Sequence, residues 1–276
     1  MNTRFVKRIF GVSAAITCVM LGVVMCVILR ANPPATEPAK EQTLDLGGEV
    51  KLKLVLIPAG KFIMGAPATE FSPYKNEGPQ HEVTISRPFY MGIYHVTQQQ
   101  YQHIMGNNRS LFKDPDNPME MVSWDDAVEF CKKVSQKTGK TVRLPTEAEW
   151  EYACRAGSTT RFSYGEDDKN FTQLGDYAWY AGNSDKKSHP VGLKKPNDWG
   201  LHEMHGNEWQ WCADWFAPYT DAKAIDPEGP ASGTHRIVRG GCWFAAGGRC
   251  RSAFRMAMTS NQRHNDIGFR VVVNSD

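Results

Sequence analysis

The chain has 276 residues, of which 41% are hydrophobic and 22% are charged, and its formal net charge is +2. These values suit a globular protein with one large domain or two small ones. Acidic and basic residues are mixed along the chain, and the absence of a basic tract interleaved with aromatic residues excludes nucleic acid as a partner. Eight tryptophans and sixteen prolines favour a loop-rich fold with aromatic packing over a helical bundle.

The N-terminus has the pattern of a membrane anchor. Arg4, Lys7 and Arg8 precede an uncharged run over residues 9–29, which would form a helix of about 31 Å and match the bilayer core. The run is longer than a signal peptide's apolar region and lacks a small-x-small cleavage site. We therefore predict an uncleaved transmembrane anchor over 1–30, with the body in the periplasm or on the extracellular side.

A stretch rich in proline, alanine and glutamate follows over residues 31–43 and predicts an extended linker. The folded domain is predicted to cover residues 44–276. Its first part contains four segments with the alternating or wholly apolar pattern of strands, bounded by proline or glycine. These predicted strands are 51–58, 60–65, 81–86 and 89–94.

Three helices are predicted from capping boxes, in which a hydroxyl side chain and an acidic or amide side chain three residues later satisfy the first backbone N–H groups. The pairs are Thr97 with Gln100, Ser123 with Asp126, and Thr146 with Glu149. A glycine stands where each helix is expected to end, namely Gly106, Gly139 and Gly157.

Almost no periodicity is visible between residues 157 and 230, where glycine, asparagine, aspartate and aromatic residues dominate. A loop region of this length within a domain is usually functional or braced by metal. Short strands are predicted at 209–212, 236–239 and 268–273. The pattern indicates one α+β unit with sparse secondary structure.

Oxygen donors in the aperiodic region predict a calcium site, because carboxylate, amide and carbonyl oxygens are the ligands of this hard cation. The candidate ligands are Glu203, the carbonyls of Gly206 and Glu208, and Gln210. A tight Gly-Asn turn without an ion is the alternative. His202 and His205 could hold zinc or iron with Glu203, but histidines that pack within loops are the favoured interpretation.

Five cysteines lie outside the apolar N-terminal run. Cys131 and Cys154 fall on helix faces and Cys212 falls among tryptophans, which predicts buried, inert thiols. Cys242 and Cys250 share a Gly-rich loop. They could bind a soft metal such as Cu(I), act as a redox pair, form a disulfide or remain separate thiols, and the sequence leaves these alternatives open.

Six motifs in order resemble the sulfatase-modifying factor family, whose best-known members are formylglycine-generating enzymes. The resemblance covers about residues 44–273. The motifs are Ile57-Pro-Ala-Gly-Lys-Phe-Ile-Met-Gly, Arg143-Leu-Pro-Thr-Glu-Ala-Glu-Trp-Glu-Tyr-Ala, Gly206-Asn-Glu-Trp-Gln-Trp, Arg239-Gly-Gly-Cys-Trp, Arg251-Ser-Ala-Phe-Arg and Ile267-Gly-Phe-Arg.

The resemblance implies a domain with a C-type-lectin-like core and bound calcium. Enzymes of this family bind Cu(I) through two cysteines and use O2 to convert a cysteine of a sulfatase into formylglycine. By resemblance, Cys242 and Cys250 would be the catalytic copper pair, and Trp209, Arg251 and Arg255 would line the pocket for a protein or peptide substrate such as a sulfatase.

Two positions depart from the family pattern. Cys242 takes the place of a serine and is separated from Cys250 by seven residues, a wider spacing than that of the copper pair. Gln210 replaces a glutamate, which removes a charged calcium ligand. The first hypothesis is a membrane-anchored oxidase of the formylglycine-generating type or a diverged relative. The alternatives are a non-catalytic extracytoplasmic binding module and a structural surface protein.

Overall fold

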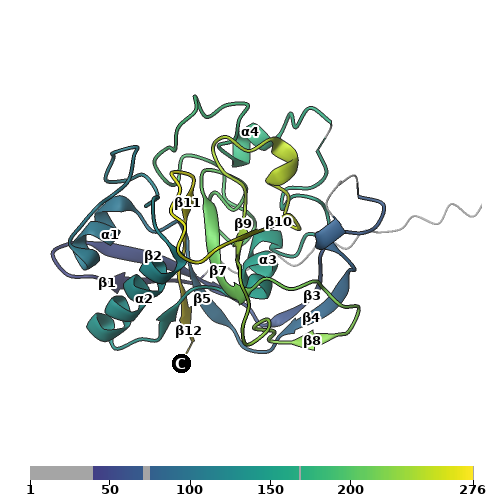
Figure 1. Ribbon diagram of the computed structural model, residues 1–276, viewed down its shortest axis with the longest axis horizontal. Coiled ribbons are helices and arrows are strands. Elements are labelled where there is room, and N and C mark those ends of the chain that lie inside the picture. Colours follow the sequence, from purple (N-terminus) through teal and green to yellow (C-terminus); the bar gives the residue numbers. More distant parts are fainter. Residues whose placement is uncertain (1–39, 71–74, 168, 276) are drawn as a thin grey trace, which may run out of the picture. The chain divides into compact units, whose positions relative to one another are not determined.

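The computed structural model describes residues 40–70, 75–167 and 169–275 (Figure 1). Within these ranges no helix is long and apolar enough to cross a membrane. The predicted anchor over 1–30 lies outside the described residues. The first strand begins at Glu41, so the predicted linker over 31–43 extends too far into the folded part.

Twelve strands form three sheets in the described part of the chain. The five-stranded sheet is antiparallel, in the order β1 (Glu41–Asp45), β2 (Lys51–Ile57), β5 (Phe89–Gly92), β12 (Val272–Asn274) and β6 (Val142–Arg143). The four-stranded sheet has the order β10 (Arg255–Met258), β9 (Arg236–Arg239), β7 (Trp209–Trp215) and β11 (Ile267–Gly268). The three-stranded sheet has the order β3 (Gly60–Met64), β4 (His81–Ile85) and β8 (Ala224–Ile225).

The helices are α1 (Gln98–Met105), α2 (Trp124–Thr138), α3 (Glu147–Arg155) and the short α4 (Leu174–Tyr177). All three predicted capping boxes are present, with both hydrogen bonds of each box formed. Gly106 and Gly139 adopt the left-handed conformation that ends α1 and α2. The α3 helix ends one residue earlier than its glycine, at Ala156, whose φ is 47°.

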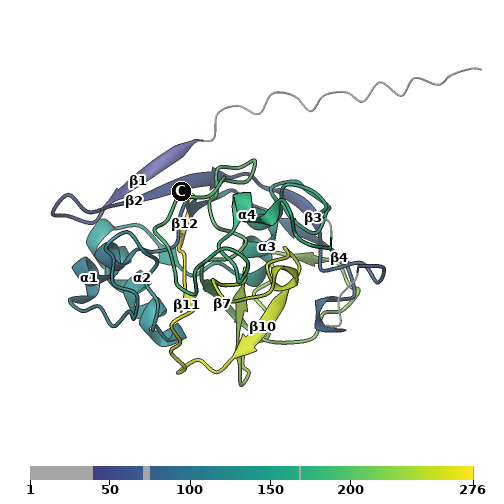
Figure 2. The same cartoon turned by 90° about the horizontal axis from the view of Figure 1, so that it is seen from above.

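Figure 2 shows α1 and α2 beside each other at one end of the five-stranded sheet, and β3 and β4 at its other end. The α3 helix packs against strands of both smaller sheets, including β3, β4, β7 and β9. This helix therefore connects β7 and β9, from the second half of the chain, to β3 and β4, from the first half.

The predicted strand at 268–273 is interrupted in the structure and forms β11 and β12 instead. The interruption surrounds Arg270, which is fully buried and whose guanidinium donates to the carbonyls of Gly92 and Ile93. Strands β1, β6, β8 and β10 were not predicted, because they are short or lack the alternating pattern of apolar residues. The predicted α+β class is confirmed.

One of the two hydrophobic cores lies around α2. Phe130 stacks on Tyr101 with ring centroids 5.7 Å apart and meets the edge of Phe269 at 5.3 Å. All three rings are buried, so α1, α2 and the last part of the chain share one aromatic cluster.

Phe130→Ala should lower the free energy of unfolding by about 3–5 kcal/mol, because it removes a buried ring and leaves a cavity. Urea denaturation followed by tryptophan fluorescence measures the change. Val128→Ala on the exposed side of the same helix is the matched control, with an expected loss within about 0.5 kcal/mol. Equal losses in the two variants would contradict the packing described here.

Candidate functional site

The Gly-rich loop of residues 240–254 connects β9 to β10, which pair with each other in antiparallel register. Gly240 and Gly241 begin it with φ angles of 99° and 83°, a region that favours glycine. A Cβ atom added at Gly241 would come within 2.5 Å of the Cys250 sulfur. The loop therefore folds back so that Cys250 lies against the backbone beside Cys242, while the turn at Gly247–Arg249 lies near α4 (Figure 1).

Cys242 and Cys250 are fully buried free thiols in this loop. Burial raises the pKa of the Cys250 thiol to about 12. Burial raises the pKa of Cys242 as well, and the nearby carboxylates of Asp266 and Glu208 raise it further. Both thiols are therefore protonated at neutral pH, and no disulfide joins any of the cysteines that the structure describes.

A Cu(I) site needs thiolates as ligands. The acidic surroundings of Cys242 oppose thiolate formation. The residues present do not fit the copper pair that the resemblance implies. The loop folds back as its glycines allow, so that Cys250 packs against Gly241, the residue before Cys242.

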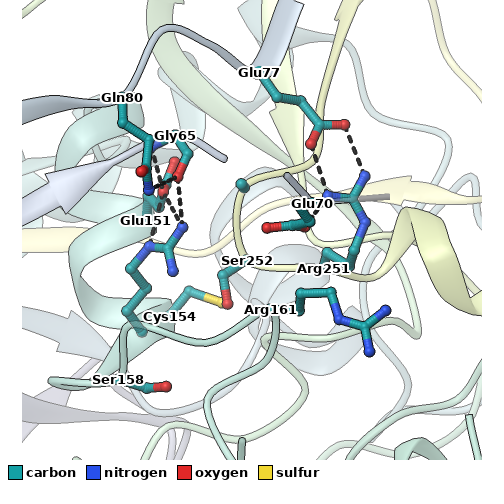
Figure 3. Close-up of polar contacts among 12 residues, drawn as sticks. Gly65, Glu70, Glu77, Gln80, Glu151, Cys154, Ser158, Arg161, Arg251 and Ser252 are labelled. Carbon is teal, nitrogen blue, oxygen red and sulfur yellow. Dashed lines mark hydrogen bonds and ion pairs between the residues drawn. The ribbon is translucent and has the colours of Figure 1, made fainter. Parts of the chain in front are cut away.

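Arg251, predicted to line a substrate pocket, is instead engaged inside the protein (Figure 3). Its two terminal nitrogens donate to Glu77 at 2.7 and 2.8 Å, and the first of them also donates to Glu70. Its Nε donates to the carbonyl of Gly248 at 2.7 Å. The guanidinium therefore has its donors directed toward protein oxygens.

Arg255 and Trp209 are also enclosed. Arg255 is 2% exposed and binds Glu147 with two hydrogen bonds of 2.8 and 2.5 Å, while the ring of Tyr219 lies 3.9 Å from its guanidinium. Trp209 is 2% exposed and its indole lies against Phe254, with ring centroids 5.6 Å apart. Arg255 and Trp209 are packed in the protein interior and do not line an open substrate pocket.

The glutamates that hold these arginines come largely from α3. Glu147 and Glu151 are one turn apart, so they lie on one face of the helix. The fully buried Arg239 contacts both, at 3.5 Å from Glu147 and 2.5 Å from Glu151, and Arg155 also binds Glu151. The arginines keep the pKa of Glu151 low against the effect of burial. The sequence signal was the Thr-Glu-Ala-Glu-Trp-Glu run, in which Glu149 was assigned to the capping box but Glu147 and Glu151 were given no role.

The four predicted calcium ligands already accept hydrogen bonds from the protein. The Glu203 carboxylate accepts from the N–H groups of Gly192 and Lys194, and burial raises its pKa to about 7. The carbonyl of Gly206 accepts from the N–H of Glu208.

The other two predicted ligands are engaged in the same way. The Glu208 carbonyl accepts from Nε2 of His95. Oε1 of Gln210 accepts from the Trp150 indole at 2.8 Å and from Nε of Arg270 at 2.6 Å. The cationic guanidinium of Arg270 thus contacts the oxygen predicted to bind calcium, and this set of residues does not fit the ion.

A second group of polar residues beside Cys242 was missed in the sequence. The carboxylates of Glu208, Asp266 and Glu120 are buried, and burial is the main cause that raises the pKa of each. The charges of Asp266 and Glu120 raise the pKa of Glu208 further. Cys242 hydrogen-bonds to Asp266. The residues come from separate segments, so only the Glu in the Gly-Asn-Glu-Trp motif offered a local signal.

The larger of the two best-formed clefts in the described residues has a volume of about 800 Å3. It lies elsewhere, between the start of α2, β6 and β8, and its lining includes Trp124, Arg143 and Asp226. Neither cleft is lined by Cys242 or Cys250. The predicted catalytic pair therefore does not open into either cleft.

The ordered motifs, the α+β fold and the Gly-rich loop define a domain of one family. The model of the sulfatase-modifying factor enzyme 1-like domain matches residues 48–275, and the chain belongs to this family. The recognition made from the motifs is confirmed.

Three proteins with different names are similar to this chain. The formylglycine-generating enzyme of Streptomyces coelicolor is 34% identical over 59% of this chain, and the chain spans 54% of that enzyme. The chaperone protein LppX of Paenibacillus barcinonensis is 31% identical, with 79% of this chain and 88% of that protein covered. The structure of Treponema denticola variable protein 1 matches with a TM-score of 0.78 and 30% identity, over 85% of this chain and 99% of that one.

Asp214, which contacts the start of α3, should make the free energy of unfolding depend on pH. Its carboxylate accepts from the N–H of Glu147 at the start of α3, and burial followed by the charge of Glu147 raises its pKa from 3.8 to about 7. Between these values the folded state retains a proton that the unfolded state releases, so this group lowers stability as the pH rises from about 4 to 7.

Asp214→Asn should remove this pH dependence while keeping an acceptor oxygen. The difference in unfolding free energy between the variant and the wild type should shift in favour of the variant by on the order of 3 kcal/mol from pH 4 to pH 7. Parallel urea titrations across this range measure it. A constant difference would contradict the raised pKa.

Proposed function

We propose that this protein is a non-catalytic protein-binding module built on the sulfatase-modifying factor domain. The carrying observation is the engagement of Arg251 and Arg255, each 2% exposed and paired with buried glutamates. The resemblance to the oxidases of the family implies that these arginines would line an open pocket. Here they stabilise the fold, so the expected substrate wall is closed.

The state of the thiols supports the same proposal. Cys242 and Cys250 are protonated and buried, and they do not fit a Cu(I) ion as thiolate ligands. Soft-metal chemistry at this loop would require both buried thiols to lose protons, and Cys242 would have to do so next to the carboxylates of Asp266 and Glu208. The similarity to a protein named as a chaperone, which extends over 88% of that protein, is consistent with a binding role.

The Gly-rich loop offers a surface for such binding. The aromatic patch consists of Leu111, Phe112, Trp243 and Phe244. Leu111 is 61% exposed and Phe244 is 50% exposed. Trp243 connects Phe112, the neighbour of Leu111 in the chain, to Phe244, with ring centroids 5.4 Å from Phe112 and 4.9 Å from Phe244. Exposed apolar groups that adjoin each other are typical of protein interaction sites, and we assign this patch to a peptide segment with an aromatic or aliphatic anchor.

Display outside the cytoplasm completes the proposal. It depends on the basic residues and the uncharged run in the first 30 residues of the sequence, which match a membrane anchor. A C-type-lectin-like core suits this role because its loops can vary while the scaffold is kept.

The full-length protein, loaded with Cu(I) and incubated in air with a Cys-x-Pro-x-Arg peptide, should yield no aldehyde product by mass spectrometry. The reason is that neither thiol is available as a thiolate and the arginines are enclosed. The Streptomyces coelicolor enzyme, treated in the same way, is the positive control. Conversion of the peptide by this protein, lost in Cys250→Ser, would refute the proposal.

Phe244→Ser should weaken binding to peptides with a central Trp or Leu by roughly tenfold, because an exposed aromatic anchor commonly contributes about 1–2 kcal/mol. Fluorescence anisotropy with a synthetic peptide series measures the dissociation constants. Ile225→Ser is the matched control, since Ile225 is a 71% exposed apolar residue in β8. Equal weakening in both variants, or none in either, would exclude the aromatic patch as the binding surface.

A further inference from the structure

A turn that carries two lysines lies against the aromatic patch. This lysine turn covers residues 184–187. The hydroxyl of the buried Ser184 donates to the carbonyl of Trp243 at 2.6 Å, and the same hydroxyl accepts from the N–H of Lys186 at 3.3 Å. Because both bonds meet on one oxygen, the backbone of Lys186 lies close to that of Trp243, and Lys187 follows directly.

The lysine turn is fixed in an uncommon conformation. Asp185 and Lys186 have φ angles of 52° and 60°, a left-handed region that residues other than glycine rarely adopt. The Ser184 carbonyl accepts from Nε2 of His189 at 2.7 Å, and the His189 ring stacks on Trp179 with centroids 3.8 Å apart. These contacts hold the strained turn in place, so little ordering is needed when a partner binds to it.

The two lysines of this turn carry unpaired charges. Lys186 and Lys187 are exposed, and neither forms an ion pair with a residue that the structure describes. The exposed Lys195, by contrast, pairs with Asp176 at 2.8 Å. The ammonium groups of Lys186 and Lys187 are therefore available to an acidic partner.

Basic residues outnumber acidic ones around the aromatic patch. The charged residues within two positions of the patch or in the lysine turn are the basic Arg109, Lys113, Lys186 and Lys187 and the acidic Asp114 and Asp185. The carboxylate of the partly buried Asp114 accepts from the N–H of Asp116 at 2.9 Å. An apolar surface with an excess of positive charge favours a partner that is both apolar and acidic.

We propose that the aromatic patch and the lysine turn form one surface that binds an acidic peptide segment, in which aspartate or glutamate stands close to an aromatic or aliphatic anchor. This inference rests on the proposed function and adds the charge of the partner. The anchor packs on Trp243 and Phe244, and the acidic side chains pair with Lys186 and Lys187. The apolar contact supplies most of the affinity, whereas the charges at the edge select the partner and speed association.

A peptide fits this surface better than an anionic bilayer does. The indole N–H of Trp243 donates to the carbonyl of Asn265 at 3.0 Å, so this ring is fixed beside the fixed turn and offers a definite geometry to an anchor. Attraction to a bilayer needs a cluster of about 4–8 basic residues. Lys113 does not add to such a cluster, because its ammonium group donates to the carbonyl of Asn108 at 2.8 Å.

Fluorescence anisotropy with the purified full-length protein and three matched peptides tests the inference. The peptides share a central tryptophan, which is flanked by glutamates, glutamines or lysines. At low ionic strength the glutamate peptide should bind about fivefold more tightly than the glutamine peptide, because exposed ion pairs contribute modestly, and the lysine peptide should bind most weakly. The preference should disappear at about 1 M NaCl, where the Debye length is about 3 Å.

The double variant Lys186→Gln/Lys187→Gln should bind the glutamate peptide no more tightly than the glutamine peptide. It should keep the wild-type affinity for the glutamine peptide, which shows that the fold and the aromatic patch are intact. Lys132→Gln is the matched control, since the Lys132 side chain is 64% exposed on α2, and it should leave the affinities for both peptides unchanged.

Equal affinity of the wild type for all three peptides would overturn the inference and leave the proposed function standing, whereas absence of binding by any peptide would refute both. An undiminished preference for the glutamate peptide in the double variant would also overturn it. Phosphatidylglycerol vesicles should leave peptide binding unchanged. Vesicles that displace the glutamate and glutamine peptides alike would assign the patch to a bilayer and contradict the proposal.

Discussion

Arg239 is fully buried, and its guanidinium joins three parts of the fold. It contacts Glu147 and Glu151 on α3, and it donates to the carbonyls of Ser252 and Ala253 at the end of the Gly-rich loop. A buried charge that loses its partner typically costs about 3–5 kcal/mol, so neither side can change alone. The position of α3, of β9 and of the loop after it therefore depends on this one set of ion pairs.

The same pairing determines what the loop can do. Because Glu147 also binds Arg255, and Glu77 binds Arg251, the arginines expected around a substrate stabilise the interior. The loop they hold in place encloses both thiols and carries Phe244 to the surface. A family member can keep the motifs of an oxidase and still present a recognition surface, since the motifs also maintain the scaffold.

Local signals predicted the helices well. Thr97, Ser123 and Thr146 cap their helices through side-chain hydrogen bonds over three residues, which a linear pattern can specify. The site could not be predicted in this way, because its contacts join residues far apart in the chain. Arg251 and Glu77 are 174 positions apart. The motif that contains Arg251 therefore gives no information about its partner Glu77.

The buried carboxylates of Glu208 and Asp266 also show that sequence motifs do not reveal contacts between distant residues. Glu208 stands in a motif that the sequence identified, yet only its carbonyl was considered as a ligand. The parallel pairing of β11 with β7 places it next to Asp266, and that pairing involves two-residue stretches with no periodic signal. The motif therefore named Glu208, whereas the acidic neighbours of its side chain became visible only in the structure.

Reactivity of the native thiols tests the central claim, that ion pairs around α3 hold the Gly-rich loop closed over Cys242 and Cys250. The full-length protein would be treated with iodoacetamide under native conditions and after unfolding in guanidinium chloride, and labelled peptides would be counted by mass spectrometry. The account predicts negligible labelling of Cys242 and Cys250 in the native protein and complete labelling after unfolding. Rapid native labelling of either thiol, at the rate of an exposed cysteine, would contradict it.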